Sequence, residues 1–82
     1  MPTRNPQIGE LYTVYQDNNE RKLLYDNKFI FVGYLEITEI ILFLGYKRGK
    51  LSGMTQDFYE VLYKNEIMHL IEHDRTYFVE AK

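Results

Sequence analysis

The fold is decided by residues 29–46, FIFVGYLEITEIILFLGY, in which two apolar, aromatic-rich runs are separated only by Thr38 and Glu39. Short runs rich in Phe, Tyr, Val and Ile are typical of β-strands, and short spacing between them is typical of a small antiparallel barrel. Three further runs of the same kind occupy residues 58–63, 67–71 and 75–81. The sequence therefore predicts an all-β domain of five short strands.

Two glycines, Gly33 and Gly45, lie inside these strand-like runs. Glycine within a strand commonly marks a bulge or a sharp bend, and small barrels need such corners. We therefore expect the sheet to bend at both positions. Six apolar residues are expected in or near the core, namely Val32, Ile41, Phe43, Val61, Leu70 and Val79.

The segment 57–72 has two interpretations. As a helix it would begin with Asp57 and Glu60 in the arrangement of a capping box, which would make the fold α+β. Helical spacing, however, places polar residues among the apolar ones on every face. A hairpin that turns at Lys64 and Asn65 collects the apolar residues on one face, so we predict the hairpin and keep the α+β fold as the alternative.

The chain has 82 residues, and we expect one small β-barrel domain at residues 9–82, preceded by an extended N-terminal arm at residues 1–8. The chain contains no Cys, so neither disulfides nor thiolate ligands contribute. No apolar run is long enough to span a bilayer. These features predict a soluble protein of the cytoplasm that does not insert into membranes.

The predicted order is a strand, a long loop, three strands joined by short turns, and a terminal strand. This order resembles the Src-homology-3 (SH3)-like barrel, with the best matches at ELYTVYQD (residues 10–17) and HDRTYFVE (residues 73–80). The resemblance implies a protein-binding module in which Tyr12, Tyr15 and Tyr77 correspond to the aromatic residues of the family's binding groove. The chain has no Trp, with which classical members grip proline-rich ligands, so it does not imply recognition of that motif.

The net charge of −2 is spread along the chain rather than gathered in a block. Nucleic-acid binding gains most of its affinity from clustered Lys and Arg. The local basic cluster is Lys47, Arg48 and Lys50, in a predicted loop. The alternative function is therefore a nucleic-acid or ribonucleoprotein-associated SH3-like domain that uses this cluster.

The histidines form the motif His69-x-x-Glu72-His73, which is the inverted signature of zinc peptidases. That chemistry needs a helix, whereas in a strand the two histidines lie about 13 Å apart, too far to share an ion. We therefore expect ordinary surface or interface histidines near a strand end, no metal and no cofactor. No other residues form a catalytic arrangement with convincing spacing, so we predict that the protein is not an enzyme.

The sequence thus favours a non-enzymatic accessory module with a protein partner, whose identity the residues do not indicate. Short acidic chains of this kind are also similar to the SH3-like accessory proteins that bacteriophages encode. For a viral protein, the expected location is the host cytoplasm or the virion, and the expected partner is a host or virion protein.

Overall fold

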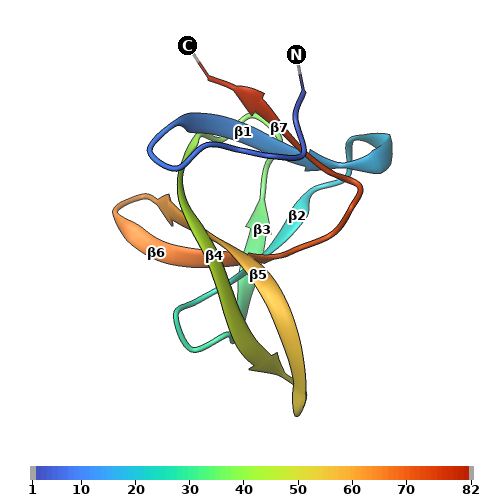
Figure 1. Cartoon of the computed structure of the whole chain (residues 1–82), viewed down its shortest axis with the longest axis vertical. Helices are drawn as coiled ribbons and strands as arrows, with labels where there is room; N and C mark the ends of the chain where they lie inside the picture. Colours follow the sequence, from blue (N-terminus) through green and yellow to red (C-terminus); the bar gives the residue numbers. More distant parts are fainter. Residues whose placement is uncertain (1, 82) are drawn as a thin grey trace.

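The computed structural model describes residues 2–81, which form a single antiparallel sheet and contain no α-helix (Figure 1). One 3₁₀ turn, η1 (Asp17–Asn19), follows the first strand. Within these residues, no helix is long and apolar enough to cross a membrane. The strands are β1 (Leu11–Gln16), β2 (Lys22–Tyr25), β3 (Phe31–Leu35), β4 (Ile41–Leu51), β5 (Met54–Tyr63), β6 (Glu66–Ile71) and β7 (Thr76–Glu80).

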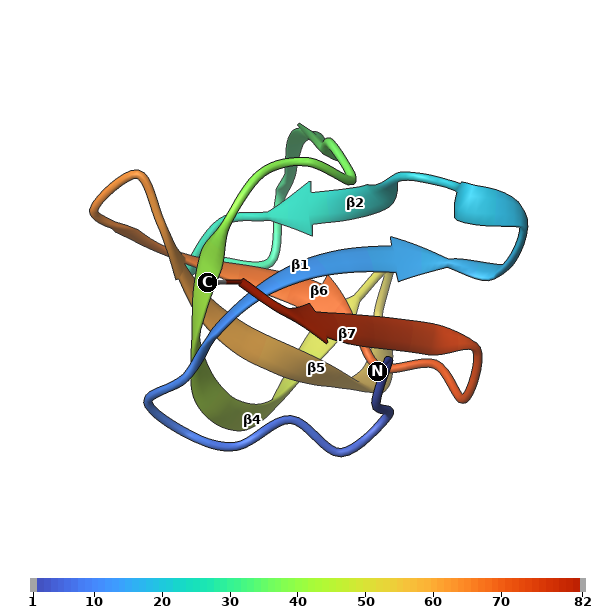
Figure 2. The same cartoon turned by 90° about the horizontal axis from the view of Figure 1, so that it is seen from above.

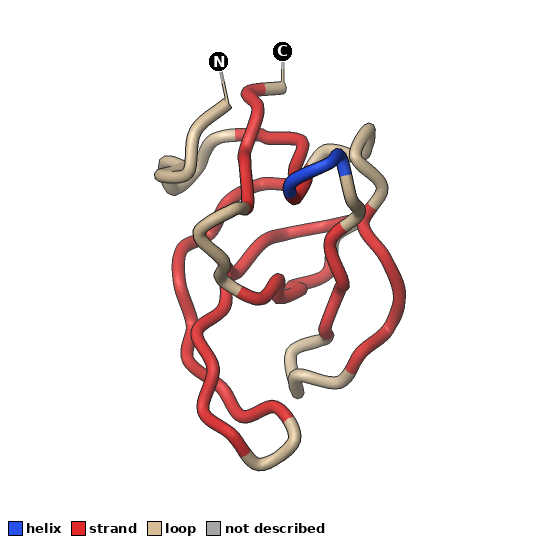
Figure 3. Tube along the Cα trace, turned by 90° about the vertical axis from the view of Figure 1, so that its right-hand side faces the viewer, coloured by secondary structure: helices blue, strands red, loops and turns tan. Residues whose placement is uncertain are grey.

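The strands follow the order β3-β2-β6-β5-β4-β1-β7, so β3 and β7 are the two edges of the sheet. The sheet is strongly coiled, and Figure 2 shows β1 and β7 lying across β5 and β6. The tube in Figure 3 shows that most of the chain is strand and that the β4–β5 hairpin projects from one end. The all-β prediction is confirmed, and the α+β alternative is wrong.

The predicted count of five strands is wrong because residues 22–35 form a hairpin of two strands. Asp26 closes the turn between them: its carboxylate oxygen Oδ1 accepts the backbone N–H of Lys28 at 2.8 Å and that of Ile30 at 3.0 Å. Phe29 adopts a left-handed backbone conformation with φ of 62°. The chain therefore reverses before Phe31, where the sequence predicts one continuous strand from Phe29 to Ile37.

The predicted hairpin in segment 57–72 is confirmed. Lys64 and Asn65 connect β5 to β6, with φ values of 51° and 64°. Positive φ at both central residues is the geometry of the tight turn that matches the twist of two antiparallel strands.

Both predicted bends are also confirmed. The pairing of β4 with β5 shifts register between Phe43 and Gly45, and β3 is irregular between Phe31 and Gly33. Gly33 and Gly45 have φ values of 152° and 134°, in the region where glycine is favoured over other residues. These bulges coil the sheet around its core.

The core lies inside the coiled sheet. Every strand contributes at least one residue to it, and β3 contributes only its last residue, Leu35. Of the six expected core residues, Ile41, Phe43, Val61 and Leu70 are buried, as predicted. Val32 is not a core residue, because it is the unpaired residue of the β3 bulge and is 50% exposed. Val79 is half-buried. The full cluster is Tyr12, Val14, Leu24, Leu35, Ile41, Phe43, Tyr59, Val61, Leu70 and Phe78.

The N-terminal residues lie against the β7 edge of the sheet. Thr3 and Phe78 exchange two backbone hydrogen bonds of 2.8 Å. Pro6 is buried, and the N–H of Gly9 donates to the carbonyl oxygen of Phe43 at 2.8 Å. One of the two sheet edges is thus covered by the chain itself.

A second aromatic cluster packs where the β2–β3 turn meets the β4–β5 hairpin. The ring of Phe29 lies 4.7 Å from that of Phe58 and 4.6 Å from that of His69, centroid to centroid. Its edge rests on Gly49, where a Cβ atom would overlap the ring. Glycine at position 49 therefore makes room for Phe29.

We expect Gly49→Ala to lower the free energy of unfolding by about 1–3 kcal/mol, because the added methyl group displaces the ring of Phe29. Urea unfolding of the single and double variants measures the effect. If the clash is the cause, Gly49→Ala should hardly change the free energy of unfolding in a protein that already carries Phe29→Ala. Additive losses in the double variant would contradict this explanation.

Candidate protein interface

Exposed apolar side chains gather on one segment of the molecule. Seven of the twelve large apolar residues that are exposed in the described chain fall between residues 23 and 40, with exposed fractions of 37–58%. An accumulation of exposed apolar side chains of this kind is typical of an interaction site. We call these residues the β3 surface: Leu23, Ile30, Phe31, Val32, Tyr34, Ile37 and Ile40.

The β3 surface surrounds an open edge of the sheet. β3 pairs with β2 on one side only, and no described residue pairs with its other side. The outward N–H and C=O groups of β3 are therefore free to bond to another strand. By contrast, the opposite edge, β7, is bridged by Thr3.

The aromatic residues of the β3 surface are held in place by their neighbours. Tyr34 lies directly across from Leu23 in the register of β2 and β3. The ring of Phe31 contacts those of Tyr25 and Tyr34 edge-on, with centroid distances of 6.0 and 5.5 Å. Aromatic side chains that are already ordered lose little conformational entropy when a partner binds.

The charges beside this surface are satisfied within the domain. The guanidinium of Arg21 lies 4.3 Å above the ring centre of Tyr34, and its Nη1 lies 2.9 Å from Oε2 of Glu36. This pair raises the pKa of Arg21, first through the hydrogen bond to Glu36. A partner therefore needs no opposite charge to bind here.

The three tyrosines expected at a groove do not lie together on the β3 surface. Tyr12 is 2% exposed and belongs to the core, where its hydroxyl accepts the N–H of Gln7 at 2.8 Å. Tyr15 and Tyr77 are half-buried and stack, with ring centroids 5.5 Å apart. They cover β1 and β7, at the other end of the strand order from β3.

The basic residues Lys47, Arg48 and Lys50 lie on strand β4 and not in a loop, so this part of the prediction is wrong. Successive residues of a strand point to opposite faces, which separates Lys47 from the other two. Arg48 also forms an ion pair with Asp57, with Nε 2.8 Å from Oδ1. The three cations do not form one patch.

His69 is buried rather than a surface residue, contrary to expectation, with 2% of its surface exposed. Its Nδ1 lies 3.0 Å from the carbonyl oxygen of Asp26, and its Nε2 lies 3.1 Å from Oε2 of Glu60. His73 lies beyond the end of β6 and is exposed. Within residues 2–81, no three His, Cys, Asp or Glu side chains are grouped so that they could hold a metal ion.

The sequence pattern did not predict the β3 surface, because apolar runs predict burial. The available signal is the loss of alternation: residues 29–32, FIFV, are apolar without interruption, which one buried face of a strand cannot accommodate. No family model matches the chain, and no curated protein or solved structure matches it significantly.

Proposed function

We propose that the protein is a non-enzymatic binding module that adds an extended segment of a partner protein to its sheet as a strand beside β3. The observation that carries this proposal is that an unpaired strand edge coincides with most of the exposed large apolar side chains among residues 2–81. Main-chain hydrogen bonds supply affinity in this mode of recognition, and alternate side chains supply specificity.

The strand order supports the further proposal that the domain is an SH3-like barrel. β1 is followed by a long connection, then by β4, β5 and β6 joined by short turns, and β7 ends the chain and pairs with β1. The β2–β3 hairpin occupies the long first connection. In this proposal, the binding surface is carried by that connection, and Tyr15 and Tyr77 lie away from it.

The partner that fits is an extended segment with apolar residues at alternate positions and little charge. Alternate residues of an added strand point to the same side, where they meet Phe31 and Tyr34. The internal pairing of Arg21 with Glu36 leaves no unbalanced charge to recruit a charged segment. For a viral protein, which is what a resemblance to bacteriophage accessory proteins would imply, the partner would be a host or virion protein.

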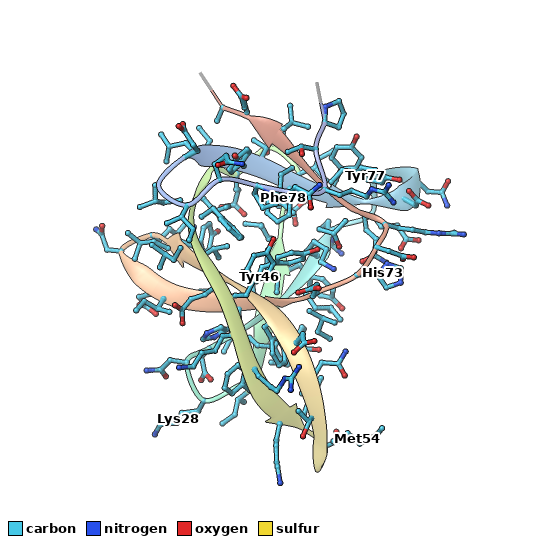
Figure 4. The ribbon with its side chains drawn as sticks, viewed as in Figure 1. Lys28, Tyr46, Met54, His73, Tyr77 and Phe78 are labelled. Carbon is cyan, nitrogen blue, oxygen red and sulfur yellow. The ribbon has the colours of Figure 1, made fainter. Side chains whose placement is uncertain are left out.

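We expect peptides selected from a random ten-residue library against the protein to alternate apolar and polar residues. Phe31→Lys and Tyr34→Lys should each weaken their binding by about tenfold to a hundredfold, or about 1–3 kcal/mol. The matched control is Met54→Lys, since Met54 is 72% exposed at the tip of the β4–β5 hairpin (Figure 4), and neither strand of that hairpin pairs with β3. Equal losses in all three variants, or none in the first two, would refute the site.

Strand addition has a separate signature in the peptide backbone. N-methylation at alternate peptide positions should abolish binding where the amide faces β3 and have little effect where it faces away. Equal sensitivity at all positions would indicate apolar contact without a hydrogen-bonded strand. Sedimentation of the free protein completes the test: a dimer that Phe31→Lys dissociates would show that a second copy, rather than a partner segment, occupies β3.

A further inference from the structure

Lys22 of β2 is buried, with 4% of its surface exposed. Its Nζ donates three hydrogen bonds, to Oε1 of Gln16 at 2.9 Å, to the carbonyl oxygen of Ile71 at 3.0 Å and to Oγ1 of Thr76 at 3.1 Å. All three acceptors are neutral. None of the ion pairs among the described residues includes Lys22.

A buried charge without a counterion is unusual, because removing it from water costs free energy that neutral acceptors only partly restore. Burial lowers the pKa of Lys22 to about 8. Groups perturbed in this way are often found at binding sites. An apolar residue at this position of β2 would fill the same space without that cost, so the lysine calls for an explanation other than packing.

A pocket of about 390 Å³ opens beside Lys22, between the β1–β2 connection and the β6–β7 turn. That turn carries His73, which is labelled in Figure 4. This volume is in the range of small-molecule sites. We call it the Lys22 pocket. Its lining combines apolar side chains, from Leu23 and Ile71, with the polar residues Gln16, Glu20, Arg21, Lys22 and His73.

The charges of the Lys22 pocket select one kind of ligand. Arg21 is already neutralised by Glu36, which leaves the ammonium of Lys22 as a cation without a partner. Glu20 is exposed in the lining, and its negative charge repels anions, most strongly those with more than one negative charge. Leu23 and Ile71 offer a surface on which a short hydrocarbon can pack.

We propose that the Lys22 pocket binds a monocarboxylate with a short apolar body, with its carboxylate toward Lys22. The carboxylate supplies the counterion that the protein lacks, and Leu23 and Ile71 contact the body. Because the three hydrogens of the ammonium are taken, the attraction is mainly electrostatic. This site is separate from the strand-binding function, although Leu23 lies at the border of the Lys22 pocket and the β3 surface.

The test compares three probes by NMR titration of backbone amides: hexanoate, hexanol and inorganic phosphate. Hexanoate should produce saturable shifts at residues 20–23 and 71–73. Hexanol has the apolar body without the charge, and phosphate has the charge without the body, so both should bind at least about tenfold more weakly. Equal binding of hexanol or of phosphate, or no saturable shift with hexanoate, would overturn the proposal.

Two variants test the charges directly. Lys22→Met should weaken hexanoate binding by about tenfold or more, and Glu20→Gln should strengthen it several-fold. Glu20 is exposed, so its replacement keeps the proposal falsifiable even where Lys22→Met fails to fold. Phe31→Lys, which disables the β3 surface, should leave hexanoate binding unchanged, and a loss in that variant would contradict the separation of the two sites.

The same titration with N-acetyl-Ala-Leu separates two sources of this chemistry. A peptide of this kind presents a carboxylate on an apolar chain end. Tighter binding than hexanoate would assign the Lys22 pocket to a protein C-terminus, and weaker binding would assign it to a free small acid.

Discussion

Phe78→Ala is expected to lower the free energy of unfolding by about 3–5 kcal/mol. Phe78 is fully buried, and its ring meets those of Tyr59, Tyr12 and Phe43 edge-on at centroid distances of 5.0, 5.6 and 5.6 Å. Phe78 lies on β7, which pairs with β1. Removing its ring would therefore leave a cavity beside the pairing of the first strand with the last. The total free energy of unfolding of a domain is only about 5–15 kcal/mol, so the variant should be close to unfolding.

Thermal unfolding measures this effect, because each kcal/mol shifts the midpoint by about 4–8 °C in a domain of this length. The matched control is Tyr77→Ala. Tyr77 directly precedes Phe78 in the same strand and points to the other face, where it stacks on Tyr15 and stays half-buried. Its loss should cost about 1 kcal/mol. Equal losses at the two positions would contradict the described orientation of β7.

The second large effect is a dependence of the free energy of unfolding on pH, caused by the titration of Lys22. Because burial lowers its pKa to about 8 in the folded state from 10.5, the unfolded state binds more protons between these values. Stability contributed by Lys22 therefore rises as pH increases from 8 to 10.5. Below pH 8 the ammonium is charged in both states, and its burial costs about 3 kcal/mol.

The measurement is urea unfolding of wild type and Lys22→Met at pH values from 7 to 11. The difference in free energy of unfolding, wild type minus variant, should rise by about 3 kcal/mol across this range. Other titrating groups are common to both proteins and cancel in the difference. A difference that does not change with pH would mean that the three neutral acceptors compensate the burial of the charge completely.

Residues whose structure depends on local pattern were predicted well. Gly33 and Gly45 mark the bends because no other residue adopts their backbone angles as easily. The turn at Lys64 and Asn65 followed from the faces that a hairpin, but not a helix, presents. These features are decided by neighbours in the chain, and so they are visible in the sequence.

Features that depend on distant contacts could not be predicted. The burial of Lys22 depends on acceptors at Ile71 and Thr76, which are 49 and 54 residues away in the chain. The β2–β3 turn depends on the side chain of Asp26 and on the unusual backbone of Phe29. That turn makes β3 an edge, and so the candidate interface was also missed.

The open edge of β3 also bears on how the protein behaves in concentrated solution. Residues 30–35, IFVGYL, contain no charge and no proline, and they combine high β-propensity with exposed backbone groups. Such a segment is a template for cross-β aggregation when nothing covers it. Production together with a strand-donating partner should therefore yield more soluble material than production of the chain alone, and an edge lysine should have the same benefit in its absence.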